Sequence, residues 1–142
     1  MLKHIIRAKV KSSIHDAFLF AHSKVKVKVN QGTVKGCVEK LPNGNDYHRF
    51  SGVPYAQSPI GDLRFKSPQK LHKFESEEID CTRERDPCFQ RSTVTKKFIG
   101  SEKDCLNLNV YVPASASSGR KLPVMVFIHG GGFIFDSNGV EL

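Results

Sequence analysis

The sequence predicts the β-rich beginning of an α/β domain, in which an antiparallel hairpin region precedes the first strands of a mixed sheet. Residues 25–29 alternate valine with lysine, and residues 106–112 alternate apolar with polar side chains, as half-buried strands do. Residues 122–128 are continuously apolar and run directly into three glycines. That arrangement is typical of a central strand that ends at a ligand site of an α/β sheet.

The first hairpin is predicted over residues 24–38. Its lysines and valines would face opposite sides of the strand, the turn falls at Asn30-Gln31-Gly32, and the second strand starts near Thr33. Turn-forming residues are dense over 41–46 and lead into Tyr47–Gly52. We therefore expect another hairpin there.

The middle of the chain predicts little regular structure. Residues 53–68 contain three prolines and a glycine, which block or bend regular elements, so this segment is expected to be a long loop. Residues 72–103 are charge-rich and irregular, and the strand over 106–112 closes at Pro113.

The apolar run 122–128 is predicted to be a central strand buried on both faces. Such a strand needs neighbouring strands and covering helices, and the sequence shows no convincing long helix. We therefore expect the isolated chain to expose a large apolar surface and to be poorly soluble or dimeric.

The formal net charge of +8 comes almost entirely from the N-terminal end. Residues 1–40 hold nine Lys or Arg against two acidic residues, whereas residues 41–142 hold thirteen against twelve. A polyanion-binding protein carries its basic stripe on the folded face, so nucleic-acid binding is disfavoured. We divide the chain into a basic arm, residues 1–23, and a domain portion, residues 24–142. The arm is interpreted as a solvated extension, with a weak targeting or membrane-surface segment as the alternative.

Membrane and metal functions are also disfavoured. No stretch approaches the ~18 apolar residues that span a bilayer, so no transmembrane segment is expected. The apolar run 17–21 is shorter than a signal-peptide core, so a cytoplasmic location is expected by default, and the compartment stays open. The four cysteines lack the paired spacing of a zinc site, so no metal or other cofactor is expected. Without a secretory signal their default state is reduced, although four thiols allow three disulfide pairings.

Gly130, Gly131 and Gly132 can carry chemistry. A turn without Cβ atoms can aim two N–H groups at one point, where they would hold the oxyanion of an acyl transfer, and each such donor contributes about 3–4 kcal/mol. The alternative is a flexible strand exit, since glycine clusters mark loops more often than active sites. A nucleotide site is disfavoured because neither nucleotide-binding glycine motif is present.

Three segments, read in order, resemble the type-B carboxylesterase family. Residues 52–68, beginning Gly-Val-Pro-Tyr-Ala, resemble its N-terminal pattern, residues 104–110 (Asp-Cys-Leu-Asn-Leu-Asn-Val) its second signature, and residues 126–133 (Val-Phe-Ile-His-Gly-Gly-Gly-Phe) its oxyanion loop. The resemblance runs from about Val25 to the end and is most similar to the insect α-esterases. It implies the N-terminal portion of an α/β-hydrolase fold, truncated before the nucleophile elbow, and a small-molecule carboxylic ester as substrate of the full-length protein.

The resemblance also implies roles for the glycine loop. Gly131 and Gly132 would supply two oxyanion-hole amides, while Gly130 and His129 shape the loop. His129 is not the triad histidine, and we interpret it as a histidine hydrogen-bonded at a strand end. The catalytic serine requires a G-x-S-x-G elbow, which is absent. Residues 115–119 come nearest to one and are interpreted as a linker.

The resemblance also bears on the four cysteines. Cys88 and Cys105 resemble the family's first disulfide, worth roughly 3 kcal/mol if it forms. Cys37 and Cys81 are then expected to be buried or free thiols.

The resemblance pairs Arg64 with an acid directly before Asp104, where this chain has Lys103, with Glu102 displaced by one position. A one-residue slip in extended chain turns a side chain to the opposite face, so we expect Glu102 not to reach Arg64. A solvated surface charge and a buried pair both stay open for Arg64.

The sequence therefore predicts the N-terminal part of a serine carboxylic ester hydrolase, inactive on its own. A non-catalytic, cholinesterase-like adhesion or binding protein is the main alternative, and a short interaction module is another. The intact glycine loop favours the enzyme, because a non-catalytic protein has no chemical need for it. The oligomeric state stays open.

Overall fold

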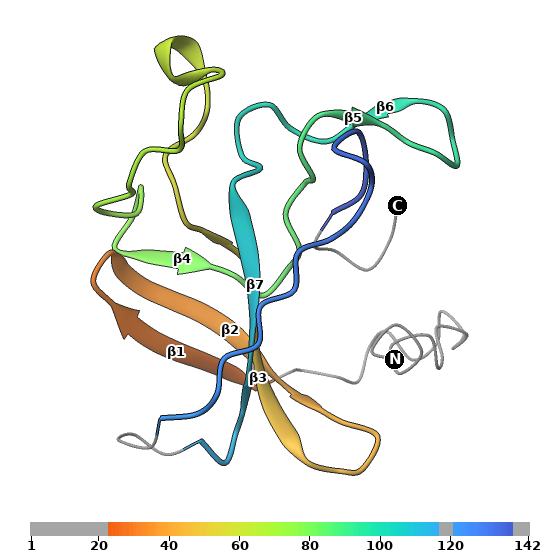
Figure 1. Ribbon diagram of the computed structural model, residues 1–142. Coiled ribbons are helices and arrows are strands. Elements are labelled where there is room, and N and C mark those ends of the chain that lie inside the picture. The colour runs from red at the N-terminus through yellow and green to blue at the C-terminus, as the bar shows by residue number, and fades with distance from the viewer. Residues whose placement is uncertain (1–22, 117–120, 138–142) are drawn as a thin grey trace.

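The computed structural model describes residues 23–116 and 121–137, so the predicted basic arm, except Ser23, lies outside the described residues. A five-stranded sheet forms its centre (Figure 1). The strands β1 (Lys24–Val29), β2 (Gly32–Lys40), β3 (Asp46–Pro54) and β7 (Asn107–Pro113) follow one another across it, all antiparallel, and β4 (Glu78–Asp80) pairs in parallel with the first part of β2. The sheet is mixed only through β4.

Both predicted hairpins are confirmed. Strands β1 and β2 pair from Lys24 opposite Cys37 to Val29 opposite Gly32, and the turn lies between them. Strands β2 and β3 form the second hairpin, which closes at Lys40 opposite Asp46. The strand predicted to close at Pro113 is β7, paired with β3.

The remaining elements are short. A 3₁₀ turn, η3 (Gly61–Leu63), is the only helical element of the predicted loop 53–68, and the part of the chain that the structure describes contains no α-helix. The region predicted to be irregular holds β4 and the two-stranded sheet of β5 (Gln90–Arg91) and β6 (Phe98–Ile99).

The two faces of the large sheet differ in polarity, because successive side chains of a strand point to opposite faces. A small hydrophobic core lies on one face, with partly buried apolar side chains around it. Its buried members are Val34, Phe50, Ile79 and Cys81. The other face carries polar side chains.

Strand β3 is irregular in the middle of its pairing with β7. Its register shifts between Phe50 and Val53, and Gly52 adopts φ +71°, a conformation that favours glycine. The amide of Gly52 donates to Asn109 Oδ1 at 2.8 Å, so β7 still holds this irregular point.

The predicted buried strand over residues 122–128 is wrong. This segment is coil (Figure 1, blue), and its side chains are exposed, Val124 by 87% and Ile128 by 83%. A central strand requires hydrogen-bonding neighbours on both sides and cover on both faces, and the described residues supply neither. The expectation that the isolated chain exposes a large apolar surface is confirmed.

Candidate active site

The three glycines form a tight turn at the end of the exposed apolar segment. Gly131 and Gly132 adopt φ +111° and +60°, and the amides of Ile134 and Phe135 both reach the Gly131 carbonyl oxygen, at 3.1 and 3.3 Å. A Cβ on Gly131 would overlap the carbonyl oxygen of Phe135, whereas one on Gly132 would meet open space. The turn therefore requires glycine at 131 for steric reasons and favours it at 132 for conformational ones.

The amides of the two glycines differ from those of Ile134 and Phe135, which are bonded within the turn. Across residues 23–116 and 121–137, neither Gly131 nor Gly132 donates a backbone hydrogen bond. Unpaired backbone N–H groups at a glycine-rich turn are a general anion-binding feature.

His129 lies at the entrance to the turn and is exposed. Its Nδ1 is 2.8 Å from the carbonyl oxygen of Gly130, a local contact within the loop. The hydrogen bond that we expected is present, but the strand end that should carry it is not.

Gln90, in β5, holds the far end of the same turn. Its side-chain Oε1 accepts a hydrogen bond from the Asp136 amide at 2.8 Å, and its Nε2 donates to the Asp136 carbonyl oxygen at 3.0 Å. The same Nε2 also donates to the Cys88 carbonyl oxygen at 3.0 Å. Gln90 is 8% exposed, so these bonds satisfy a buried amide. Sequence analysis missed this residue, which has no motif to mark it and a partner 46 positions away.

Cys88 and Cys105 are joined by a disulfide, as the family resemblance implied. The 17-residue separation encloses β5 and β6 and so includes Gln90. Within this disulfide loop, the rings of Phe89 and Phe98 stack with centroids 5.3 Å apart. The loop is thus cross-linked at its ends and packed across its hairpin.

The other two cysteines are buried free thiols, as expected. Cys81 belongs to the hydrophobic core, and burial raises the pKa of its thiol. Cys37 lies on the opposite face of β2 from Val34, close to the Thr82 carbonyl oxygen. The reduced state that we expected by default for all four cysteines therefore applies only to these two.

Arg64 and Glu102 do meet, contrary to our expectation. Arg64 Nη1 lies 3.3 Å from Glu102 Oε2. The alternation argument fails because Glu102 is in a bend, where the amides of Lys103 and Asp104 both donate to Ser101 Oγ. Both side chains are 55% exposed, so this is a solvated surface pair and not a buried one.

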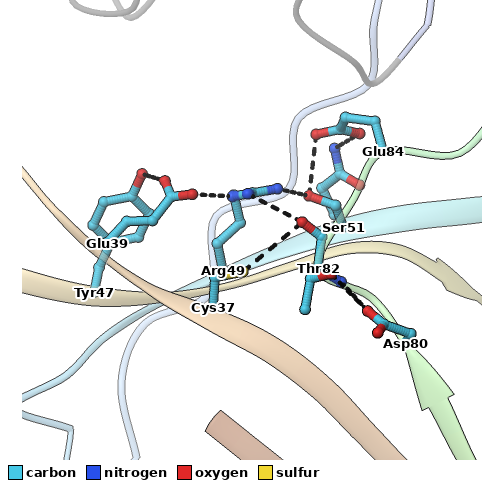
Figure 2. Close-up of polar contacts among 9 residues, drawn as sticks. Cys37, Glu39, Tyr47, Arg49, Ser51, Asp80, Thr82 and Glu84 are labelled. Carbon is cyan, nitrogen blue, oxygen red and sulfur yellow. Dashed lines mark hydrogen bonds and ion pairs between the residues drawn. The ribbon is translucent and has the colours of Figure 1, made fainter. Parts of the chain in front are cut away.

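A polar cluster, separate from the glycine turn, occupies the face of the sheet opposite the hydrophobic core (Figure 2). Glu39 accepts hydrogen bonds from Tyr47 Oη at 2.5 Å and from Arg49 Nε at 2.7 Å. Arg49 Nη1 donates to Ser51 Oγ at 2.6 Å, and Ser51 donates to Glu84 at 3.1 Å. The chain of bonds ties β2 and β3 to the segment that follows β4.

The electrostatics of this cluster are those of a structural network. Burial, together with the bond to Glu39, raises the pKa of Tyr47 to about 12. Burial acts to lower the pKa of Arg49 and is the largest single influence, but the hydrogen bond and the charge of Glu39, with the charges around them, together outweigh it, so the net shift is upward. On the neighbouring strands, the bond to Lys35 and those from Thr82 hold the pKa of Asp80 well below its usual range. Each shift favours the protonation state already present at neutral pH, so none of these groups is prepared for proton transfer.

Within residues 23–116 and 121–137, no three His, Cys, Asp or Glu side chains gather as a set of metal ligands. No helix in those ranges has the length and apolar character needed to cross a membrane.

Comparison with known proteins identifies the family. Residues 23–140 match the model of the carboxylesterase family. The chain belongs to this family. The carboxylesterase relatives include juvenile hormone esterase of Tribolium castaneum, 42% identical over 120 residues, and esterase B1 of Culex pipiens, 39% identical over 116. These matches cover 83% and 82% of this chain but only 20% and 21% of the two relatives.

The solved structures agree. Juvenile hormone esterase from Manduca sexta, crystallised with OTFP covalently attached, has a TM-score of 0.68 and 38% identity over 80% of this chain and 22% of its own. A PNB esterase gives a TM-score of 0.63 at 38% identity, over 78% of this chain and 22% of its own. The chain therefore corresponds to the N-terminal region of the α/β-hydrolase family of carboxylesterases and spans about a fifth of the curated relatives it matches.

Proposed function

We propose that this chain is the N-terminal part of a serine carboxylic ester hydrolase, in which the amides of Gly131 and Gly132 stabilise the oxyanion. The observation that carries the proposal is a turn of left-handed glycines with unused amides, in a chain of the carboxylesterase family. In this proposal, residues 24–142 belong to the esterase domain and residues 1–23 precede it.

The reaction is a two-step acyl transfer. The serine hydroxyl gives its proton to the triad histidine as its oxygen bonds to the ester carbonyl carbon, and the carbonyl electron pair moves onto the carbonyl oxygen. Collapse of that tetrahedral species breaks the bond to the alcohol oxygen, which takes the proton from the histidine and leaves as the alcohol, with an acyl-enzyme remaining. Water then repeats the addition and releases the acid. Negative charge develops on the same oxygen in both steps, so two fixed N–H donors lower both barriers.

The catalytic serine, its histidine and the triad acid are not in this sequence, which contains no G-x-S-x-G elbow. We therefore propose that the 142-residue chain alone does not turn over esters. Small-molecule carboxylic esters are the proposed substrate class of the complete protein. The names of the relatives from Tribolium castaneum and Manduca sexta support an ester substrate.

Gly132→Ala in the complete protein tests the oxyanion role. The added Cβ has space but is disfavoured at φ +60°, so the turn becomes strained and we expect its amide to be redirected. We expect kcat to fall by ~10²-fold with KM nearly unchanged, because the lost interaction exists only in the transition state. Steady-state kinetics on a short-chain nitrophenyl ester measures both constants.

Gly61→Ala is the matched control. Gly61 also has open space for a Cβ and a similar φ of +55°, but it lies in η3. It incurs the same conformational cost away from the turn and should leave kcat unchanged. Equal losses in the two variants would refute the proposal. Turnover by the 142-residue chain that an organophosphate abolishes would show a nucleophile within it and refute the proposed incompleteness.

A further inference from the structure

Gln90 is placed to control the glycine turn from a distance. It contacts Asp136, which adopts φ +91° and ends the compact segment that begins at Gly131. Both backbone groups of Asp136 are bound, the N–H by Oε1 and the C=O by Nε2. A side-chain amide that pairs with both groups of one residue reproduces the two bonds of a β-ladder pair and fixes that residue in position and direction.

The other end of this contact, at Gln90, is held at several points. Gln90 lies in β5, paired with Ile99 of β6, and its Nε2 also binds the Cys88 carbonyl oxygen. Cys88 is cross-linked to Cys105, which directly precedes the segment leading into β7. The side chain is therefore held by its strand partner, by a hydrogen bond to the disulfide residue and by burial.

Asp136, which Gln90 holds, lies only a few residues along the chain from the amides of Gly131 and Gly132. The Gly131 carbonyl oxygen accepts from Ile134 and Phe135, so residues 131–135 are closed into one turn, and Asp136 follows it directly. Because a Cβ at Gly131 would strike the Phe135 carbonyl, this turn is already packed against itself. Movement of Asp136 is therefore transmitted to the glycines, since the turn has little room to absorb it.

We propose that Gln90 is a positioning residue, which fixes the downstream end of the glycine turn and so the direction of the Gly131 and Gly132 amides. The inference rests on the proposed oxyanion role of those amides. The disulfide loop then contributes to catalysis by supporting Gln90, and it does so without contacting the substrate.

The test uses Gln90→Met in the complete protein, which keeps length and removes all three hydrogen bonds. A displaced donor costs transition-state stabilisation but not ester binding, so we expect kcat to fall by about tenfold with KM within about twofold. The affinity for a trifluoromethyl ketone, whose serine adduct places an oxyanion at the same point, should fall in parallel with kcat. Gln90→Glu keeps an accepting oxygen but has no N–H for the Asp136 carbonyl, and kcat should fall for it too.

Gln57→Met is the matched control. Gln57 Nε2 also donates to a loop carbonyl, that of Lys70 at 3.1 Å, but it is exposed and far from the turn in sequence. We expect its kcat and inhibitor affinity to equal those of the wild type. In the 142-residue chain, the amide of Asp136 should exchange with solvent faster in Gln90→Met than in the wild type, while the amide of Cys81, bound to the Lys35 carbonyl, should not change.

The outcomes separate the two proposals. If Gly132→Ala lowers kcat and both Gln90 variants do not, the positioning role is overturned and the oxyanion role stands. If Gly132→Ala behaves like Gly61→Ala, the oxyanion role itself fails. A lower apparent kcat in Gln90→Met that disappears once rates are divided by the titrated number of active sites, with unchanged inhibitor affinity, would mark a general folding defect and also overturn the positioning role.

Discussion

At the scale of single residues, Glu39 organises the polar face of the sheet by accepting from two side chains of β3. One of its oxygens binds Tyr47 and the other binds Arg49. Because the acceptor is a carboxylate, both bonds are charge-assisted; Arg49 adds a charged donor, whereas Tyr47 donates as a neutral phenol. The network is partly buried, and removal of any member leaves a polar group without its partner.

Tyr47 makes this network sensitive to alkaline pH. Its pKa is raised from 10.0 to about 12, so the folded state holds the phenolic proton more tightly than the unfolded state. The resulting stabilisation is complete below pH 10 and is lost as the pH rises toward about 12. We expect Tyr47→Phe to be less stable than the wild type at neutral pH, yet to lose less stability between those pH values.

Urea unfolding of the 142-residue chain across this pH range measures the difference. Tyr55→Phe serves as the control, because Tyr55 is 49% exposed and lies outside the network. Burial also raises the pKa of Tyr111, so the alkaline loss should be reduced in Tyr47→Phe and not abolished. Identical pH profiles for wild type and Tyr47→Phe would show that Tyr47 is not linked to folding.

At the scale of elements, sequence analysis succeeded where the pattern is local. The lysine–valine alternation of β1 and the apolar alternation of β7 gave the correct strands, because a sheet with one covered face imposes a period of two. It failed over 122–128, because an apolar run indicates that a segment is stabilised by burial but does not show that the segments needed to bury it are present. It failed for Glu102, because the period of two does not hold in a bend.

The candidate site was predictable in one half only. The glycines of the turn stand next to one another in the sequence, so their special backbone could be expected from composition. Gln90 could not be found in this way, since it lies 46 residues from Asp136 and acts through two backbone groups that any residue possesses.

The disulfide loop is the element whose contribution to stability can be measured directly. Closing 17 residues restricts the unfolded chain, which is worth roughly 3 kcal/mol. We expect the double variant Cys88→Ser/Cys105→Ser to lose about that much free energy of unfolding in urea. Reduction of the wild type should give the same loss, whereas reduction of the double variant should change nothing. A double variant as stable as the oxidised wild type would show that the cross-link is dispensable.

At the scale of the whole molecule, the structure is a small, well-paired sheet joined to an unprotected apolar segment. The exposed side chains of residues 124–128 are contiguous, and three of them are Val126, Phe127 and Ile128, exposed by 78%, 74% and 83%. Contiguous apolar surface of this kind mediates association. Carboxylesterase relatives are about four times as long, so they have many more residues with which to cover the equivalent segment.

The isolated chain is therefore expected to self-associate. Sedimentation should show dimers or larger species whose population rises with protein concentration. Val126→Lys should shift the distribution toward monomer, because burying an unpaired ammonium at the contact is unfavourable. Val94→Lys is the control, since Val94 is similarly exposed, by 72%, but lies in the disulfide loop. A monodisperse wild-type monomer with a sharp cooperative melt would contradict this expectation.

The crowding at Gly131 also limits which mutations this position can accept. Every single-base missense change in a glycine codon installs a side chain, and at this position any side chain collides with the Phe135 carbonyl. Its neighbour Gly130 faces open space without a positive φ, so substitution there meets neither obstacle, whereas Gly132 faces open space but has φ +60° and carries a proposed oxyanion amide. Selection against substitution is thus expected to differ among the three glycines and to be strongest at Gly131.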